Sequence, residues 1–297
     1  MPPVQAGFTV AMPELAKRLN ESTQGRIQFQ LFSGGEIAPP PELYTTCANG
    51  MVDMILSTGG HYFGVMPLAN VEGSLALNFR DSSDIAVLQF DKGLLPLFQA
   101  EHTKHGTHFL TLLAAGRSGL ISKKPIHTIA DLKGYKIRTF GGYSPLYASL
   151  GATPVTMPLG EAYLALSTGT VDAAVTGFSA HLDLKHYEVA KYALQTDQGA
   201  WSLVMNNDAW EALPDDLKSI LTLTVYDFAD WWVRNYDLYN PSVEGLKEKG
   251  VEFVDMEPGE FAKFETAAIA LWDEVAAKDA VAAKAIGILK DYYAKKD

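Results

Sequence analysis

The chain has 297 residues, of which 47% are apolar and 20% charged, a balance that suits a soluble protein of one large or two modest domains. Its net charge of −11 argues against a nucleic-acid surface, because such a surface needs concentrated basic residues. The single cysteine, Cys47, excludes an intrachain disulfide, and no apolar run reaches transmembrane length. The opening Met1-Pro2-Pro3 does not read as a signal peptide, which a mature secreted protein would also lack.

Hydrophobic periodicity predicts a mixed α/β chain. Strands are expected at 26–32 (RIQFQLF), 107–115 (THFLTLLAA) and 135–141 (YKIRTFG), with a loop at 116–125. Shorter helices are expected at 83–104, 128–133, 143–150 and 207–212. Pro214 to Tyr239 carries apolar residues at helical spacing without glycine, which predicts a long amphipathic helix that Pro241 ends or kinks. The tail, 258–294, is also expected to be helical.

Two segments share one pattern. Residues 42–56 (ELYTTCANGMVDMIL) and 161–175 (EAYLALSTGTVDAAV) agree at four positions, which are Glu42/Glu161, Tyr44/Tyr163, Gly50/Gly169 and Asp53/Asp172. Each copy predicts a helix with glutamate in its first turn, a left-handed glycine that ends it, and then a short buried strand. A strand candidate precedes each helix, so both copies read as βαβ units, and the long offset favours two similar α/β lobes over a solenoid.

Arg138 is the strongest candidate for a ligand contact. It stands at the end of the strand KIR and opens onto the loop TFGGYS, and ligands of open α/β sheets bind beyond the carboxyl ends of strands. A guanidinium there offers a rigid fork that matches a carboxylate. Gly141 and Gly142 would let the backbone approach a ligand. Pairing of Arg138 with a structural acid is an equally open alternative.

Other candidates follow the same strand ends. Arg117, in AAGRSG, is either a second ligand contact or an ordinary loop arginine. Aromatic and imidazole side chains that could wall an apolar pocket or pack in the core are His61, Tyr62, Phe63, Tyr143, Phe178 and Trp201.

Enzyme and metal signatures are weak. His102, His105 and His108 are spaced by three, but Gly106 interrupts the helix that a metal site would need. Ser179 does not lie in a GxSxG nucleophile elbow, because His181 replaces the last glycine. The chain has no GxGxxG or Walker loop, so the sequence predicts no catalytic residue, no metal and no cofactor.

The run 130–177, ADLKGYKIRTFGGYSPLYASLGATPVTMPLGEAYLALSTGTVDAAVTG, resembles the signature region of the solute receptors of tripartite ATP-independent periplasmic (TRAP) transporters. Members typically read DLKG-K-R and then LGA-PV-MP--E-Y-AL-TG-VD. GRIQFQLFSGGEI, NGMVDMILS and WEALPDDLK also resemble the family, so the similarity covers nearly the whole chain.

The resemblance implies a two-lobed periplasmic-binding-protein-like α/β fold with a ligand cleft between the lobes and a long helix bracing both. The expected lobes are 1–115 plus 205–243 and 116–204 plus 244–297. The implied function is a periplasmic receptor that binds a small carboxylate and delivers it to integral membrane transporter subunits, with no reaction and no nucleic-acid partner. Arg138 matches the family arginine that binds the carboxylate, and Arg117 matches the place of a second arginine. The family often has asparagine where Thr176 stands, which shifts the expected polar contacts to Thr176 or His61.

A second departure concerns the start. Members open with a strand before the first helix, whereas MPPVQAG stands about where that helix begins, and we expect either a gap or an open sheet edge there. Two other functions stay open. A ligand-sensing binding protein for signalling would look similar, and an enzyme on the same scaffold would need an acid/base pair or nucleophile facing the cleft.

Overall fold

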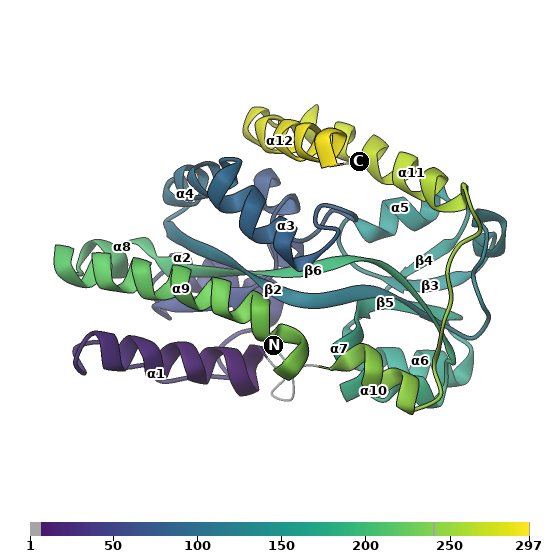
Figure 1. The fold of residues 1–297 in the computed structure, drawn as a ribbon, viewed down its shortest axis with the longest axis horizontal. Helices are drawn as coiled ribbons and strands as arrows, with labels where there is room; N and C mark the ends of the chain where they lie inside the picture. The colour runs from purple at the N-terminus through teal and green to yellow at the C-terminus, as the bar shows by residue number, and fades with distance from the viewer. Residues whose placement is uncertain (1–6, 240, 297) are drawn as a thin grey trace.

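The structure, a computed structural model, describes residues 7–239 and 241–296. These residues form one mixed sheet of seven strands in the order β1-β6-β2-β5-β3-β4, with β7 beside β6, and helices cover both faces (Figure 1). The strands are β1 Met54–Ser57, β2 Thr107–Ser122, β3 Lys136–Thr139, β4 Thr153–Thr156, β5 Ala173–Gly177, β6 Tyr192–Asn206 and β7 Glu252–Phe253. The helices are α1 Met12–Ser22, α2 Leu43–Ala48, α3 Ser82–Ala86, α4 Leu94–Lys104, α5 Tyr143–Ser149, α6 Ala162–Thr168, α7 Phe178–Asp183, α8 Asn207–Glu211, α9 Asp215–Tyr239, α10 Ser242–Glu248, α11 Glu260–Ala276 and α12 Ala280–Lys296.

The two long strands β2 and β6 run antiparallel through the whole sheet and divide it into halves. In one half, β1 pairs with the Asn206 end of β6, and in the other, β5 pairs with the Ser122 end of β2. The second half continues in parallel from β5 to β3 and β4. This arrangement positions the two lobes, because each half of the sheet carries its own layer of helices (Figure 1).

The long helix α9 is attached to the middle of β2. Trp232 donates from Nε1 to the carbonyl of Ala114 at 2.8 Å, and the Tyr236 hydroxyl donates to the carbonyl of Ala115 at 2.7 Å. At this point the pairing of β2 with β6 shifts register between Ala114 and Gly116, so a bulge lies under the helix. The predicted long helix is therefore confirmed, and it holds the place where the two halves of the sheet meet.

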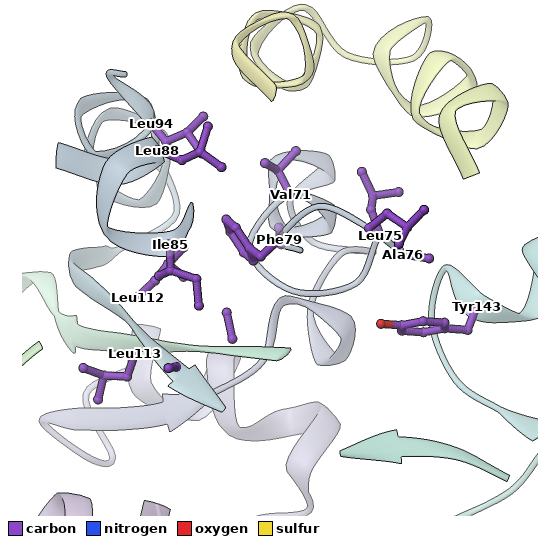
Figure 2. Close-up of a cluster of buried hydrophobic side chains, with 14 of the residues drawn as sticks. Val71, Leu75, Ala76, Phe79, Ile85, Leu88, Leu94, Leu112, Leu113 and Tyr143 are labelled. Carbon is purple, nitrogen blue, oxygen red and sulfur yellow. The ribbon is translucent and has the colours of Figure 1, made fainter. Parts of the chain in front are cut away.

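A large apolar cluster packs the first lobe and extends toward the second. Figure 2 shows Val71, Leu75 and Phe79 gathered between the helices and the sheet, with Tyr143 entering from the other side. A smaller cluster around Leu166, Phe178 and Leu246 fills the space between the second half of the sheet and helices α6, α7 and α10. The tail spans both regions, because α11 contacts α5 and α12 contacts α4.

The internal repeat is confirmed in three dimensions. Each copy is a short 3-10 turn, a helix (α2 or α6) and a strand (β1 or β5). Gly50 and Gly169 have φ of 73° and 78°, the left-handed conformation predicted for both helix ends. Only the second copy completes a parallel βαβ unit, because β5 pairs with β3 whereas β1 pairs with antiparallel β6 alone among the described strands.

Two strand predictions are wrong. Residues 26–32 have the expected alternation but form no strand, because no described strand lies beside them to complete a ladder. The loop expected at 116–125 is largely strand, since β2 continues to Ser122. Its glycines allow close approach instead of ending the strand: a Cβ on Gly119 would lie 2.1 Å from the Leu194 carbonyl oxygen.

The helix predictions hold with small changes. The stretch 83–104 is divided at Gly93, whose φ of 92° ends the first segment. The segment 128–133 is a 3-10 helix, Ile129–Leu132, and the tail is two helices instead of one. Within the described part of the chain, no helix is both long enough and apolar enough to cross a bilayer.

The expected open edge of the sheet is present, since β1 has no partner among the described residues on the side away from β6. The family's additional first strand belongs before α1, where residues 1–6 lie outside the described chain.

The bulge under α9 gives a test of the fold. Gly116 has φ of 89°, and a Cβ there would lie 2.2 Å from the Tyr236 hydroxyl oxygen. We expect Gly116→Ala to lower the free energy of unfolding by about 2–4 kcal/mol, because it adds a steric clash to left-handed strain. Urea denaturation measures the change. Gly250→Ala is the matched control, since its φ is 79° and nothing lies within 4 Å of the new Cβ. Equal losses in the two variants would show that Tyr236 does not hold the bulge.

Candidate functional site

Arg138 lies in β3, one residue before the strand ends, and its side chain is only 6% exposed. Its Nε donates to the carbonyl of Met157 at 3.2 Å, and its Nη1 donates to the carbonyl of Val175 at 3.0 Å. Among the described residues, Nη2 has no hydrogen-bond partner. Two backbone carbonyls, from the segments that follow β4 and that form β5, therefore fix the guanidinium without neutralising it.

The charge on Arg138 is not compensated. No acidic side chain of the described chain lies within ion-pair distance of it, so the structural-acid alternative is not supported. Burial lowers the pKa of Arg138 to about 10, which leaves the group cationic at neutral pH. The ring of Phe140 lies 5.4 Å from the guanidinium carbon, a cation–π contact that is much weaker than an ion pair. A buried, hydrogen-bonded but unpaired cation can accept an anionic partner, so Arg138 remains a candidate ligand contact.

His61 approaches the same region from the other lobe. It ends a 3-10 turn, Gly59–His61, directly after β1, and its Nδ1 lies 3.2 Å from the Ser57 hydroxyl. A Cβ on Gly60 would lie 3.6 Å from the Phe140 ring, so the turn reaches the ring that contacts Arg138. The His61 side chain is exposed, yet crowding by protein atoms, with a further contribution from Arg138, lowers its pKa to about 4. His61 is therefore neutral at pH 7 and offers a ring nitrogen as a hydrogen-bonding group.

The loop after β3 meets the first lobe through its two glycines. The Gly142 amide donates to the Ser74 hydroxyl at 3.2 Å. A Cβ on Gly141 or on Gly142 would lie 2.6 Å from an oxygen of Ser74. The close approach predicted for these glycines is present, and the neighbour in this structure is Ser74.

Asp197 in β6 is a buried acid that the sequence did not indicate. It accepts hydrogen bonds from the hydroxyls of Ser118 and Tyr143, the latter at 2.6 Å, and from the amide of Leu77 at 3.3 Å. Burial raises its pKa, although these donors oppose the rise. These donors come from the segment before α3 (Leu77), from β2 (Ser118) and from α5 (Tyr143), so Asp197 links three segments of the chain by hydrogen bonds.

The structure separates the predicted aromatic residues. Tyr62 is buried in the first lobe, stacked on Tyr44 and donating to Glu72, and Phe178 is buried against Phe253. These two side chains are therefore placed in the core. The Tyr143 hydroxyl donates to Asp197, and Figure 2 shows the Tyr143 ring pointing toward the first lobe. Trp201 is partly buried and packs against the large apolar cluster. Phe140, which the sequence analysis did not select, is the aromatic side chain that contacts Arg138.

Arg117 and Thr176 differ in their relation to Arg138. Arg117 is exposed, 4.0 Å from Asp237 of α9, and lines a separate cavity of about 340 Å³ together with Arg80 and Gln198. The structure does not bring it to the Arg138 guanidinium. Thr176, 9% exposed, directly follows Val175, the residue whose carbonyl holds Arg138.

The three spaced histidines diverge. His102 is buried and bonded to Glu72 at 3.0 Å, while the His108 ring stacks on Trp210 with 3.9 Å between centroids. The Ser179–His181 pair is buried, and His181 contacts His186 at 2.9 Å. These side chains serve packing and internal hydrogen bonding.

Comparison with known proteins places this geometry in a family. Residues 7–279 match the family described as bacterial extracellular solute-binding protein, family 7. The chain is 26% identical over 254 residues to the 2,3-diketo-L-gulonate-binding periplasmic protein of Escherichia coli, covering 82% of this chain and 76% of that protein. It is 24% identical over 286 residues to a monocarboxylate 2-oxoacid-binding periplasmic protein of Nostoc, covering 94% and 78%.

A solved structure agrees over nearly the whole chain. A TRAP periplasmic solute-binding protein of Chromohalobacter salexigens, with bound (S)-(+)-2-amino-1-propanol, superposes with a TM-score of 0.84 at 26% identity and covers 98% of this chain and 92% of that one. The two-lobed fold and the resemblance to TRAP solute receptors are thus confirmed. The chain belongs to family 7 of the bacterial extracellular solute-binding proteins.

Proposed function

We propose that this protein is a periplasmic receptor that binds a small organic acid through Arg138 and delivers it to the membrane subunits of a TRAP transporter. The observation that carries the proposal is the buried guanidinium, which is fixed by two carbonyls and lacks an acidic partner among the described residues. A ligand carboxylate would supply the missing charge and a partner for Nη2.

The relatives support an acid as the ligand class, since two of them are named for a diketo sugar acid and for 2-oxo monocarboxylates. The Chromohalobacter protein holds an amino alcohol, so the fold also accommodates a cationic compound. For this chain the unneutralised Arg138 favours the acid, because a cationic ligand would add a second positive charge to a poorly solvated site.

Three further residues complete the proposed site. His61 would offer a neutral ring nitrogen to a second polar group of the ligand, and Thr176 would offer its hydroxyl beside the carboxylate. Phe140 would cover the apolar part, since its ring already lies against both the guanidinium and the His61 turn. Arg117 would not contact the ligand directly, because its charged neighbour in this structure is Asp237. Any contribution of Arg117 to binding would be a long-range charge attraction.

The lobes would close around the ligand by bending at the bulge between Ala114 and Gly116. Under this proposal residues 1–115 with 205–243 and residues 116–204 with 244–297 move as the two lobes. Closing excludes water and strengthens the pairing of Arg138 with the carboxylate, so the ligand shifts the population toward the closed form. The membrane partner would recognise that form. The receptor would release the acid unchanged.

Replacement of Arg138 tests the site. We expect Arg138→Met to weaken binding of the preferred acid more than 100-fold, because the carboxylate loses its only charged partner. The free energy of unfolding should change by no more than about 2 kcal/mol, since removal of a buried charge offsets two lost hydrogen bonds. A thermal-shift screen of organic acids finds the ligand, and calorimetry gives the affinities.

Arg117→Met is the matched control, as it removes an equal charge from an exposed position. Its affinity should stay within a few-fold of the parent. Equal losses in both variants would mean that long-range charge attracts the ligand and that Arg138 is no direct contact.

The pKa of His61 provides an independent test. Without ligand, the imidazole signal should titrate at about pH 4, and it should titrate at a higher pH once an acid neutralises Arg138. Because the unfolded histidine titrates near 6.5, the contribution of His61 to stability is full above about pH 6.5 and is lost as the pH falls to about 4. NMR titration with His61→Gln for assignment measures the first effect. A pKa that does not move on saturation with the acid would place the ligand away from Arg138.

A further inference from the structure

A contact between the two lobes lies directly beside the proposed carboxylate site. Ser74 of the first lobe accepts a hydrogen bond from the amide of Gly142, in the loop that follows β3, with 3.2 Å between the two atoms. A Cβ on Gly141 would lie 2.6 Å from the Ser74 hydroxyl oxygen and 3.8 Å from the Cα of Gly60, in the turn that carries His61. We call the contact of Ser74 with Gly141 and Gly142 the Ser74 clasp.

The first-lobe side of the clasp is fixed to the turn that presents His61. Ser74 is fully buried, and its amide donates to the carbonyl of Asn70 at 3.0 Å. The residue before it, Gly73, accepts from the Thr58 hydroxyl at 3.2 Å. Thr58 directly precedes the turn Gly59–His61. Ser74 and this turn are therefore held together as one part of the first lobe.

The second-lobe side of the clasp is fixed to the strand that carries Arg138. Gly141 and Gly142 follow Arg138 after only two other residues. The hydroxyls of Thr139 and Ser144 lie 2.7 Å apart, and the Ser144 amide donates to the Gly141 carbonyl at 3.3 Å. These bonds close the loop on the end of β3. The clasp therefore joins the segment that holds the guanidinium to the segment that holds the imidazole.

The second lobe itself does not require glycine at position 142. Gly142 has φ of −66° and ψ of −12°, ordinary right-handed values that any residue adopts. The three atoms nearest to a Cβ on Gly142 belong to Ser74 and Leu75 of the first lobe, and the closest is the Ser74 carbonyl oxygen at 2.6 Å. A side chain at this position is thus excluded by the other lobe. Gly141 differs, because its φ of 50° favours glycine whether or not the lobes touch.

We propose that the Ser74 clasp is a positioning contact that forms when the lobes close on the ligand and breaks when they open. The proposal rests on the receptor function proposed above and deepens it, because the clasp sets the separation of Arg138 from the His61 turn. Ser74 contacts no ligand atom, so the clasp stabilises the closed form equally for every acid. Without ligand the open form prevails, and the clasp then adds little to stability.

Gly142→Ala tests the proposal on the intact chain. We expect it to weaken binding of every acid by one common factor of at least about tenfold, because the added methyl group meets Ser74 only in the closed form. Calorimetry with pyruvate, 2-oxobutyrate and D-glucuronate measures this factor. Urea denaturation without ligand should give an unfolding constant within about threefold of the parent, since φ suits alanine. Gly160→Ala is the matched control in the same lobe, with nothing within 4 Å of the new Cβ, and should change neither quantity.

Ser74→Ala removes the acceptor and leaves both glycines in place. We expect a common loss of about three- to tenfold for all three acids, because one hydrogen bond between the lobes is lost in the closed form. Thr176→Ala gives the contrast, since a residue that contacts the ligand should change the ratio of affinities between pyruvate and D-glucuronate. A common factor at Ser74 and a changed ratio at Thr176 would separate positioning from direct contact.

Three results would overturn the proposal. Lower stability of ligand-free Gly142→Ala than of Gly160→Ala would mean that the contact is permanent. A changed ratio of affinities in Gly142→Ala would mean that the loop contacts the ligand, and parent affinity in that variant would mean that closing does not form the clasp. The receptor function fails by other results, which are no binding of any acid or parent affinity in Arg138→Met. The urea measurement needs no ligand, so it decides on the clasp even then.

Discussion

The pairing of β2 with β6 is the constraint on which the rest of the structure depends. These two strands are the only elements in the described chain that belong to both halves of the sheet, so the relative position of the lobes is set where their ladder is interrupted. The ladder shifts register at three places, and the one between Ala114 and Gly116 is held by two hydrogen bonds from α9, whose Trp232 and Tyr236 reach consecutive carbonyls of β2. The helix therefore supports the irregularity that lies between the two halves of the sheet.

Two buried acids near this junction have internal partners, whereas the buried cation has no acidic one. Asp197 is surrounded by donors from three segments, and Glu72 accepts from Tyr62 and Ser202 while it contacts His102. The protein itself therefore supplies hydrogen-bond partners for both carboxylates. Arg138 is the exception, because its partners are neutral carbonyls. Because Asp197 and Glu72 are matched internally, an unmatched cation at a strand end indicates a ligand more strongly than its position alone does.

The sequence predicted those parts of the fold that local chemistry determines. The two copies of the Glu-Tyr-Gly-Asp pattern became equivalent helix–strand units because a left-handed glycine and a short apolar run act within a few residues. The sequence prediction failed where residues distant in the chain determine whether a segment forms a strand. Residues 116–125 were expected to form a loop, but β2 continues to Ser122, and at Gly119 the backbone of β6 approaches so closely that glycine is what permits the pairing. Residues 26–32 indicated a strand, but a strand also requires a partner, which periodicity cannot supply. Arg138 was predicted as a ligand contact from its place at a strand end, whereas Phe140 and Asp197 have no local signal and are recognised only by what surrounds them.

The repeat also explains why one lobe carries the cation and the other the neutral partner. In the second copy, β5 is completed by β3, and the parallel pair brings Arg138 beside the carbonyl of Val175. In the first copy, the residues that correspond to β3 in order, 26–32, do not pair with β1, so no side chain of that segment is fixed at the strand end. The position after β1 is instead occupied by the turn Gly59–His61, anchored by Ser57. The two lobes thus offer different chemistry from one repeated pattern: a fixed charge from the complete unit and a neutral, exposed imidazole from the incomplete one. A ligand with a carboxylate at one end and a neutral polar group at the other matches this asymmetry, because each end then meets the lobe whose chemistry complements it.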